Sequence, residues 1–286
     1  MSGPGPLGII AGAGELPLAL ARALRDDGRA VFVLVLEGIA DASEFAKVPH
    51  ACASIGEVGN IIRQLNDAGC SEVTLAGRVA RPEFSSIKLD RIGRQHIGGI
   101  LAAALKGDDA LLRAVISILE KHGLRVVGSA DVTRGLLAPA GPIGKIAPRR
   151  ADMQDIRQGL RVVNALGQLD IGQAAVVCSG LVLAVEAAEG TDEMLSRIAG
   201  LPESLRGSKS ARRGVLIKAV KPGQERRVDL PVIGARTVEL ASAAGLSGIA
   251  VQQSAVLVLN RSRVAELADR DGLFVYGVDA AKATND

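Results

Sequence analysis

Short apolar runs alternate with stretches of helical hydrophobic spacing through the first half of the chain. Unbroken apolar strands separated by helices are typical of a parallel sheet that is covered by helices on both faces. The predicted elements are strands at Leu7–Ala11, Ala30–Leu36, Glu72–Ala76 and Leu124–Gly128, and helices at Glu15–Asp26, Val58–Ala68 and roughly Gly93–His122, the last interrupted near Gly107.

The pattern changes after Asp131. Residues 131–148 contain three prolines, three glycines and no clear period, so we interpret 132–148 as a linker between an N-terminal domain, 1–131, and a C-terminal domain, 149–286. Short strands in quick succession predict a mixed sheet in the second half. Its predicted helices are Asp152–Leu166, Thr191–Ala199, Arg236–Ala243 and Arg261–Arg270, and its predicted strands Ala174–Cys178, Leu181–Ala187, Gly214–Val220, one near Val228, Ile249–Val251 and Ala255–Leu259.

Composition narrows the class of protein. Only 2% of the residues are aromatic and there is no Trp, which argues against single-strand nucleic-acid binding because that function uses aromatic stacking platforms. The net charge of +3 is small, and the lysines and arginines are interspersed with acids. Cys52, Cys70 and Cys178 have no CxxC spacing, and no apolar run reaches the length of a membrane span. We therefore expect a soluble cytoplasmic protein with reduced thiols.

A glycine turn lies between the first strand and the first helix. Gly12, Ala13 and Gly14 place backbone N–H groups and a helix N-terminus where a phosphate or diphosphate can bind. Pro17 stands where a dinucleotide fingerprint has its third glycine. A ligand cradle and a plain turn both remain open. Gly77 and Arg78, at the end of a later strand, occupy the position where open α/β sheets bind ligands.

Acids cluster around Gly190. Helix capping by Thr191 and the helix dipole explain Asp192 and Glu193 without any function. They do not explain Glu186, since a carboxylate on an apolar strand is costly unless it is paired or bound to a metal. The cluster therefore contains candidate metal ligands next to ordinary capping residues.

A second block, 218–231, mixes cations with one carboxylate. Lys218, Lys221 and Arg227 can neutralise a diphosphate, and Asp229 either pairs with an arginine or binds a metal. A charged surface hairpin has the same composition. Near Gly107, Asp108 can simply cap the following helix, although Lys106 beside it makes contact with a substrate plausible.

Four stretches together resemble one known family. They are the Ile10–Pro17 turn, the 107–115 segment, the EGTDEML block at 189–195 and the KPGQ..RVDLP block at 221–231, in the family's order from about Leu7 to Val278. In these stretches the chain resembles the metal-dependent UDP-2,3-diacylglucosamine pyrophosphatases of lipid A biosynthesis, I-type. The resemblance implies an N-terminal Rossmann-like domain and a C-terminal mixed-sheet α/β domain, with the active site in the cleft between them.

The resemblance also implies an activity, a cofactor and partners. The reaction is Mg²⁺-dependent hydrolysis of UDP-2,3-diacylglucosamine to 2,3-diacylglucosamine 1-phosphate (lipid X) and UMP. Peripheral contact with the cytoplasmic face of the inner membrane and a homodimer are expected, without nucleic acid. The implied catalytic residues are Asp229, Glu189 and Asp192; the implied metal ligands are Asp229, Glu186 and Asp192; and the implied substrate-binding residues are Gly12, Ala13, Gly14, Gly77, Arg78, Lys106, Asp108, Thr191, Lys218, Lys221, Gln224 and Arg227.

The residues by themselves are also compatible with two other classes of function. A nicotinamide-dependent oxidoreductase would use the Gly12–Gly14 turn for NAD and would need no metal. A non-catalytic UDP-sugar-binding protein would have a solvated acidic turn and no turnover.

Overall fold

The computed structural model of the chain describes residues 5–80, 87–222 and 230–280. These residues form two compact units, one up to Gly135 and the other from Leu136 onward. The change from one unit to the other lies inside the segment 132–148 that the sequence marks as a linker. Part of that segment, Gly141–Pro142, is a strand of the second unit.

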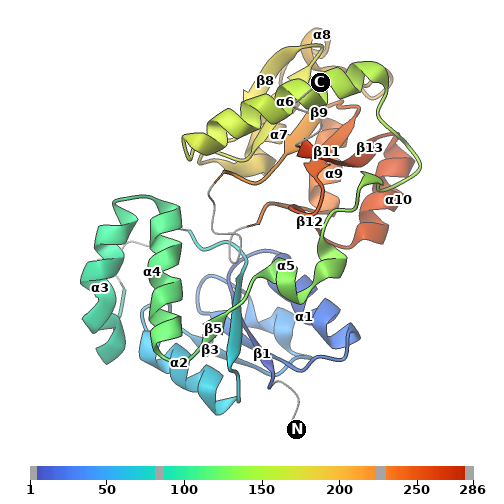
Figure 1. Cartoon of the computed structure of the whole chain (residues 1–286). Helices are drawn as coiled ribbons and strands as arrows, with labels where there is room; N and C mark the ends of the chain where they lie inside the picture. Colours follow the sequence, from blue (N-terminus) through green and yellow to red (C-terminus); the bar gives the residue numbers. More distant parts are fainter. Residues whose placement is uncertain (1–4, 81–86, 223–229, 281–286) are drawn as a thin grey trace. The chain divides into compact units, whose positions relative to one another are not determined.

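The first unit contains a five-stranded sheet in the order β3-β2-β1-β4-β5 (Figure 1). Each of its neighbouring strand pairs is parallel, and the first strand, β1, is completely buried. The unbroken apolar runs of the sequence therefore reflect a sheet that is covered on both faces, which confirms the Rossmann-like prediction. The strands are β1 Leu7–Ala11, β2 Val31–Leu36, β3 His50–Ala53, β4 Glu72–Ala76 and β5 Arg125–Val126.

Helices cover both faces of this sheet. Ile61, Ile62 and Leu65 of one helix and Ile116 and Leu119 of another share a buried apolar cluster with the strands. The first helix contacts β1 and β2 from the opposite face. The helices of this unit are α1 Leu16–Asp26, α2 Val58–Asp67, α3 Arg91–Ala104, α4 Asp108–Lys121 and α5 Ser129–Val132, with 3-10 turns η1 Ala42–Phe45 and η3 Arg134–Leu136, the last of which reaches the boundary with the second unit.

The second unit contains a mixed six-stranded sheet in the order β6-β13-β11-β9-β7-β8. Its middle strands β13, β11 and β9 are parallel, whereas β6, β7 and β8 each run antiparallel to a neighbour. This confirms the mixed sheet. The strands are β6 Gly141–Pro142, β7 Ala174–Cys178, β8 Leu181–Val185, β9 Val215–Lys218, β11 Gly248–Gln252 and β13 Phe274–Val278, with a separate parallel pair β10 Val232–Ile233 and β12 Leu257–Val258.

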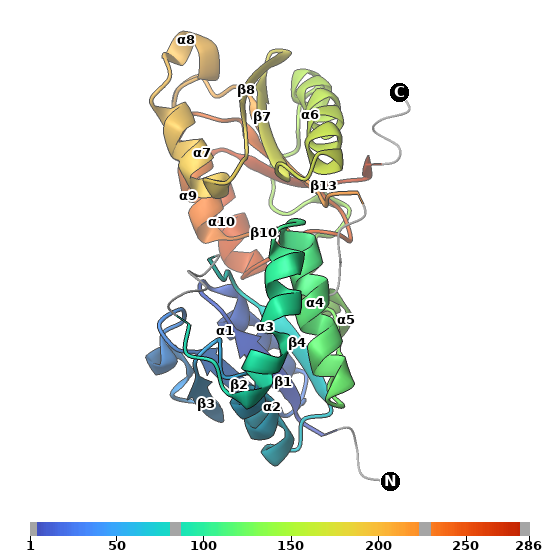
Figure 2. The ribbon, with the colours of Figure 1, turned by 90° about the vertical axis from the view of Figure 1, so that its left-hand side faces the viewer.

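Figure 2 shows α6 on one side of this sheet and α7, α9 and α10 on the other. Two buried apolar clusters correspond to these two layers. Gly159 lets α6 lie close to the sheet, because a Cβ there would meet the Ile217 side chain at 2.3 Å. The helices are α6 Arg150–Gln168, α7 Gly190–Ala199, α8 Glu203–Arg206, α9 Ala235–Ala243 and α10 Arg261–Asp271.

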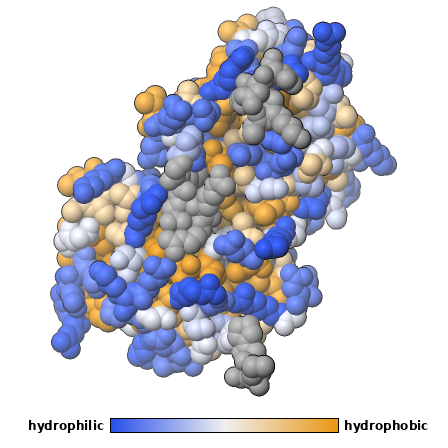
Figure 3. Space-filling model, viewed as in Figure 1, coloured by the Kyte–Doolittle hydropathy of each residue, from blue (hydrophilic) through white to orange (hydrophobic). Residues whose placement is uncertain are grey.

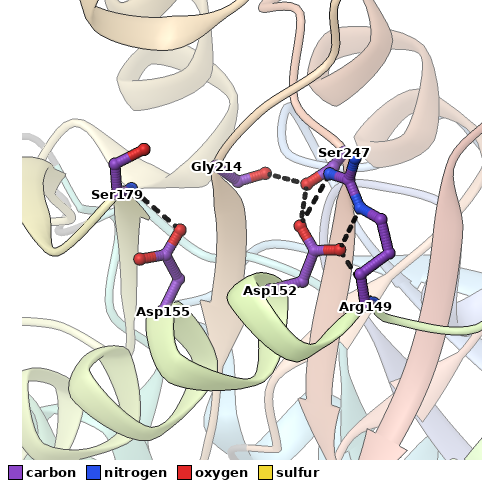
Figure 4. Close-up of polar contacts among 6 residues, drawn as sticks. All are labelled: Arg149, Asp152, Asp155, Ser179, Gly214 and Ser247. Atoms are coloured by element: carbon purple, nitrogen blue, oxygen red, sulfur yellow. Dashed lines mark hydrogen bonds and ion pairs between the residues drawn. The ribbon is translucent and has the colours of Figure 1, made fainter.

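Two buried aspartates attach α6 to the sheet (Figure 4). Asp152 accepts hydrogen bonds from the backbone N–H and the guanidinium of Arg149 and from the Ser247 hydroxyl at 2.7 Å. Burial raises the pKa of Asp152, but these hydrogen bonds and the charge of Arg149 outweigh it, so that the pKa lies below its usual value. The Asp152 carboxylate is therefore a structural anion.

Asp155, one turn further along α6, holds the hairpin between β7 and β8. Its two carboxylate oxygens accept the backbone N–H groups of Ser179 at 2.9 Å and Gly180 at 2.8 Å. Both turn residues have positive φ, 51° and 79°, as a two-residue type I′ hairpin requires. The β7–β8 hairpin is thus fixed by a side chain from the helix that covers it.

Candidate functional site

The carboxyl edge of the first sheet contains one group of candidate site residues. The strand order reverses between β1 and β4, and open α/β sheets bind ligands at such a switch point. The predicted residues Gly12, Ala13 and Gly14 follow β1, and Gly77 and Arg78 follow β4. The structure thus brings these two predicted segments to the same point of the sheet.

The two loops are joined through their backbones. Ala13 and Arg78 exchange two hydrogen bonds of 2.8 Å each, and the Gly12 N–H donates to the Ala76 carbonyl at 2.8 Å. A Cβ on Gly12 would lie 2.7 Å from the Arg78 carbonyl oxygen, and one on Gly77, where φ is +90°, would lie 2.7 Å from the backbone of Gly12. Gly12 and Gly77 are therefore required by the close approach of the two loops.

Gly14 has a different environment. Its φ is +100°, and a Cβ there would have no heavy atom within 4 Å. The N-cap residue Glu15 makes no side-chain cap to α1, and the Arg78 side chain is exposed. Open space, a helix N-terminus and a cation suit an anionic ligand at this edge.

Lys106 and Asp108 lie on the short turn between α3 and α4, on elements separate from the two glycine loops. Gly107, the N-cap residue between them, has a φ of 120°, which a glycine tolerates. Both flanking side chains are exposed. A role for either residue in substrate binding stays a prediction.

In the second unit, a buried hydrogen-bonded chain lies at the carboxyl end of β9. The Lys218 ammonium donates to the Thr191 hydroxyl at 2.7 Å, and this hydroxyl donates to Glu186 Oε1 at 2.6 Å. Lys218, Thr191 and Glu186 are 6%, 8% and 6% exposed. Glu186 Oε2 accepts the Gln173 backbone N–H at 3.1 Å, so both carboxylate oxygens have hydrogen-bond partners.

This chain explains why a carboxylate stands at the end of an apolar strand. A buried Glu is stable when it is paired and hydrogen-bonded, and the cation of β9 reaches it through the hydroxyl at the start of α7. The next strand contributes Gln252, whose side-chain oxygen accepts the Val220 N–H at 3.2 Å. We call Glu186, Thr191 and Lys218 the buried polar chain.

The other acids of the 186–193 block face the surface. Glu189 pairs with Arg197 at 2.7 Å, and Asp192 pairs with Arg236 of α9, also at 2.7 Å. Their side chains are 32% and 34% exposed. Exposed ion pairs of this kind contribute little to stability. The block thus divides into one inward carboxylate, Glu186, two acids that make surface ion pairs, and the exposed Glu193.

Across the described ranges, no three His, Cys, Asp or Glu side chains are grouped so that they could hold a metal ion. Both Glu186 oxygens accept hydrogen bonds and Asp192 faces Arg236, so these two residues by themselves do not suit Mg²⁺. Lys221 pairs with Asp170 at 2.7 Å. Gln224, Arg227 and Asp229 lie outside the described residues, and their predicted roles stay predictions.

Gln252, at the carboxyl edge of the second sheet, was not among the predicted site residues. The only signal was its position at the end of a late apolar run, 249–251. Nothing in that run shows that β11 pairs with β9, the pairing that brings the Gln252 amide to Val220.

Comparisons with known proteins agree with this architecture. A family model of the LpxI N-terminal domain matches residues 6–136, and one of the LpxI C-terminal domain matches residues 139–276. A protein of Caulobacter vibrioides, described as UDP-2,3-diacylglucosamine pyrophosphatase LpxI, is 48% identical over 273 residues, which cover 96% of this chain and 97% of that protein. The two family models lie end to end over nearly the whole chain, and the chain belongs to the LpxI family.

Proposed function

We propose that this protein is a hydrolase that cleaves the diphosphate of UDP-2,3-diacylglucosamine in lipid A biosynthesis and releases 2,3-diacylglucosamine 1-phosphate (lipid X) and UMP. The observation that carries the proposal is the 48% identity, over 96% of the chain, to a protein named for this substrate. The two carboxyl edges support it, because one offers a glycine turn beside a helix N-terminus and the other a buried cation.

Each edge has its own role in this proposal. The open space at Gly14, the N-terminus of α1 that follows it and the exposed Arg78 side chain bind part of the substrate, while Gly12 and Gly77 allow the two loops to pair. Lys218 supplies positive charge at the end of β9, where charge that builds on phosphate oxygens is stabilised. Thr191 and Glu186 hold the ammonium in one position, because each accepts the hydrogen bond that the preceding group donates. Lys221, Gln224 and Arg227 bind the phosphates together with Lys218, and we call these four residues the phosphate clamp.

The proposal includes Mg²⁺ and Asp229. Mg²⁺ would polarise the diphosphate and make a bound water more acidic. In this proposal Asp229 is the central metal ligand, and Glu186 and Asp192, which by themselves do not suit Mg²⁺, support it. Removal of Mg²⁺ by a chelator should stop turnover, and added Mg²⁺ should restore it. Turnover that continues unchanged in chelator would remove the metal from the proposal.

The direct test uses the purified protein and UDP-2,3-diacylglucosamine, with mass spectrometry of the products. UMP and lipid X are expected in equal amounts. Substrate binding without either product would favour the non-catalytic UDP-sugar-binding protein. Thermal stabilisation by NAD, but not by the UDP-sugar or by lipid X, would favour the oxidoreductase.

A finer test concerns which phosphorus water attacks. We propose attack on the sugar-side phosphorus, with UMP as the leaving group, so the clamp around Lys218 would centre on that phosphate. Reaction in ¹⁸O-labelled water should then place the label in lipid X. Label in UMP would contradict this placement while leaving the identity of the products unchanged.

We also propose that the protein works at the cytoplasmic face of the inner membrane and forms a homodimer. Across the described helices, none combines the length and apolarity that spanning a membrane requires. We propose that the protein's contact with lipid is peripheral. Cell fractionation and light scattering of the purified protein test the two statements separately, since a monomer in light scattering leaves the localisation untouched.

A further inference from the structure

One face of α3 is exposed and has charges of a single sign. Positions 91, 94, 98, 101 and 105 lie close together around the helix, and all five side chains or glycines are exposed. Between residues 91 and 107 the chain contains Arg91, Arg94 and Lys106 but no Asp or Glu. We call the exposed set of Arg91, Arg94, Gly98, Leu101, Ala102 and Leu105 the α3 face.

The two ends of the α3 face differ. Arg91 and Arg94 mark its start, whereas Leu101 and Leu105, 40% and 90% exposed, mark its end. Figure 3 shows orange and tan atoms at this end of the α3–α4 pair, with blue atoms beside them. Of the large apolar side chains that the structure describes as exposed, Leu105 is the most exposed. The midpoint of the two arginines and the midpoint of the two leucines lie about 16 Å apart along the helix.

The opposite side of α3 explains why this helix stays folded with leucines in water. Gly93 and Ala104 are buried, and α3 packs along α4. Gly98 and Gly99, on the outer side, have no heavy atom within 4 Å of an added Cβ. The outer side is thus a shallow surface without a partner among the described residues of its own unit.

We propose that the α3 face docks on an anionic lipid surface. Its cations complement acidic headgroups, and Leu101, Ala102 and Leu105 can enter the boundary between headgroups and acyl chains, as basic amphipathic helices do. A second copy of the chain fits less well, because a two-fold pairing that covers the whole face would place the arginines of one copy opposite the arginines or the leucines of the other, with no acid to meet them. The choice of a lipid partner rests on the proposed function, whose substrate carries two acyl chains.

Vesicle sedimentation without substrate tests the docking. The intact protein should sediment with vesicles of phosphatidylcholine and phosphatidylglycerol, but only weakly with phosphatidylcholine alone, and added salt should weaken binding. A Leu101→Glu and Leu105→Glu double variant should lose at least about tenfold in partition coefficient, because two apolar contacts are replaced by charges that acidic lipids repel. Both positions are exposed, so thermal unfolding should be unchanged.

A matched control variant carries two Leu→Glu changes in the second unit, away from the α3 face. Leu169 and Leu205, in the second unit, are 71% and 43% exposed, and the Leu169→Glu and Leu205→Glu double variant should bind vesicles like the intact protein. Equal losses in both double variants would overturn the proposal, as would an intact protein that stays in the supernatant. Dissociation of a dimer by the α3 variant, seen in light scattering, would also overturn it.

Activity separates this inference from the proposed function. Substrate in detergent micelles should be hydrolysed equally by the intact protein and the α3 double variant, whereas substrate embedded in anionic vesicles should be hydrolysed more slowly by the variant. If no preparation hydrolyses the substrate, the proposed function fails, and the sedimentation result still decides the docking.

Discussion

The two sheets present different chemistry at their carboxyl edges. In the first unit the edge consists of backbone, since Gly12 and Gly77 let two loops pair and leave open space at Gly14. In the second unit the edge consists of buried side chains, linked from Lys218 through Thr191 to Glu186. A helix N-terminus beside open space suits binding of a phosphate group, whereas a fixed charge suits stabilisation of a transition state. We therefore propose that the first edge mainly binds substrate and that the second carries the chemistry.

The largest expected effect is at Asp229. Asp229→Asn keeps the shape of the side chain and removes its charge, so turnover should fall by about a thousandfold or more while substrate binding persists. Rate measurements at saturating substrate, together with thermal stabilisation by the UDP-sugar, check this. Activity within a few-fold of the parent would remove Asp229 from the mechanism.

A glycine pair tests the first edge. Gly77→Ala should lower the free energy of unfolding by about 3 kcal/mol, because the new methyl group meets the backbone of Gly12 and φ is positive. Gly14→Ala also has a positive φ, but open space, and should cost about 1 kcal/mol. Urea denaturation of both variants measures the difference. Equal costs would mean that the loops do not need their close approach.

Asp152 tests whether a buried carboxylate of the second unit can be purely structural. Asp152→Asn should lower the free energy of unfolding by about 2 kcal/mol at neutral pH without changing turnover. Because the pKa of Asp152 is lowered in the folded state, its contribution is complete above the unfolded pKa of about 3.9 and is lost as pH falls through the folded pKa. Denaturation curves of the two proteins should therefore converge in acid. A large loss of turnover in a folded variant would contradict the structural role.

The smallest effects are expected at the surface ion pairs. Glu189→Gln and Asp192→Asn should each change the free energy of unfolding by no more than about 0.5 kcal/mol, since both pairs are exposed. Urea denaturation checks this, with Arg236→Gln as the matched partner variant. Because folding is expected to survive, a fall in kcat in either variant would support the predicted catalytic role. A loss of several kcal/mol would show that these pairs hold α7 in place.

Most of the regular elements could be predicted from the sequence, and the failures have physical causes. β1, β4 and β7 have the predicted bounds because they are short, mainly apolar segments between clear turns. β3, His50–Ala53, was missed because short, small residues at a sheet edge leave no apolar run. β13, Phe274–Val278, was missed although it is buried, since a glycine within a short segment after a helix resembles a turn.

The contacts of the buried polar chain could be predicted from the sequence only in part. The sequence showed that Glu186 needs a partner, because its neighbours are apolar, and it showed Lys218 as a candidate cation. It could not show that the two share Thr191, since that depends on β7 lying between β8 and β9. Likewise, nothing local to Asp192 predicts its pair with Arg236, which comes from another helix.

Lys218 offers the most direct test of the claim that the second edge carries the chemistry. Lys218→Met keeps the length of the side chain and removes the charge, and a Lys218→Met and Glu186→Gln double variant also removes the unpaired carboxylate, so that folding is preserved. We predict that kcat/KM for UDP-2,3-diacylglucosamine falls by about a hundredfold or more in both, while Lys209→Met, at an exposed lysine of the same unit, behaves like the parent. A folded double variant with kcat/KM within a few-fold of the parent would contradict it.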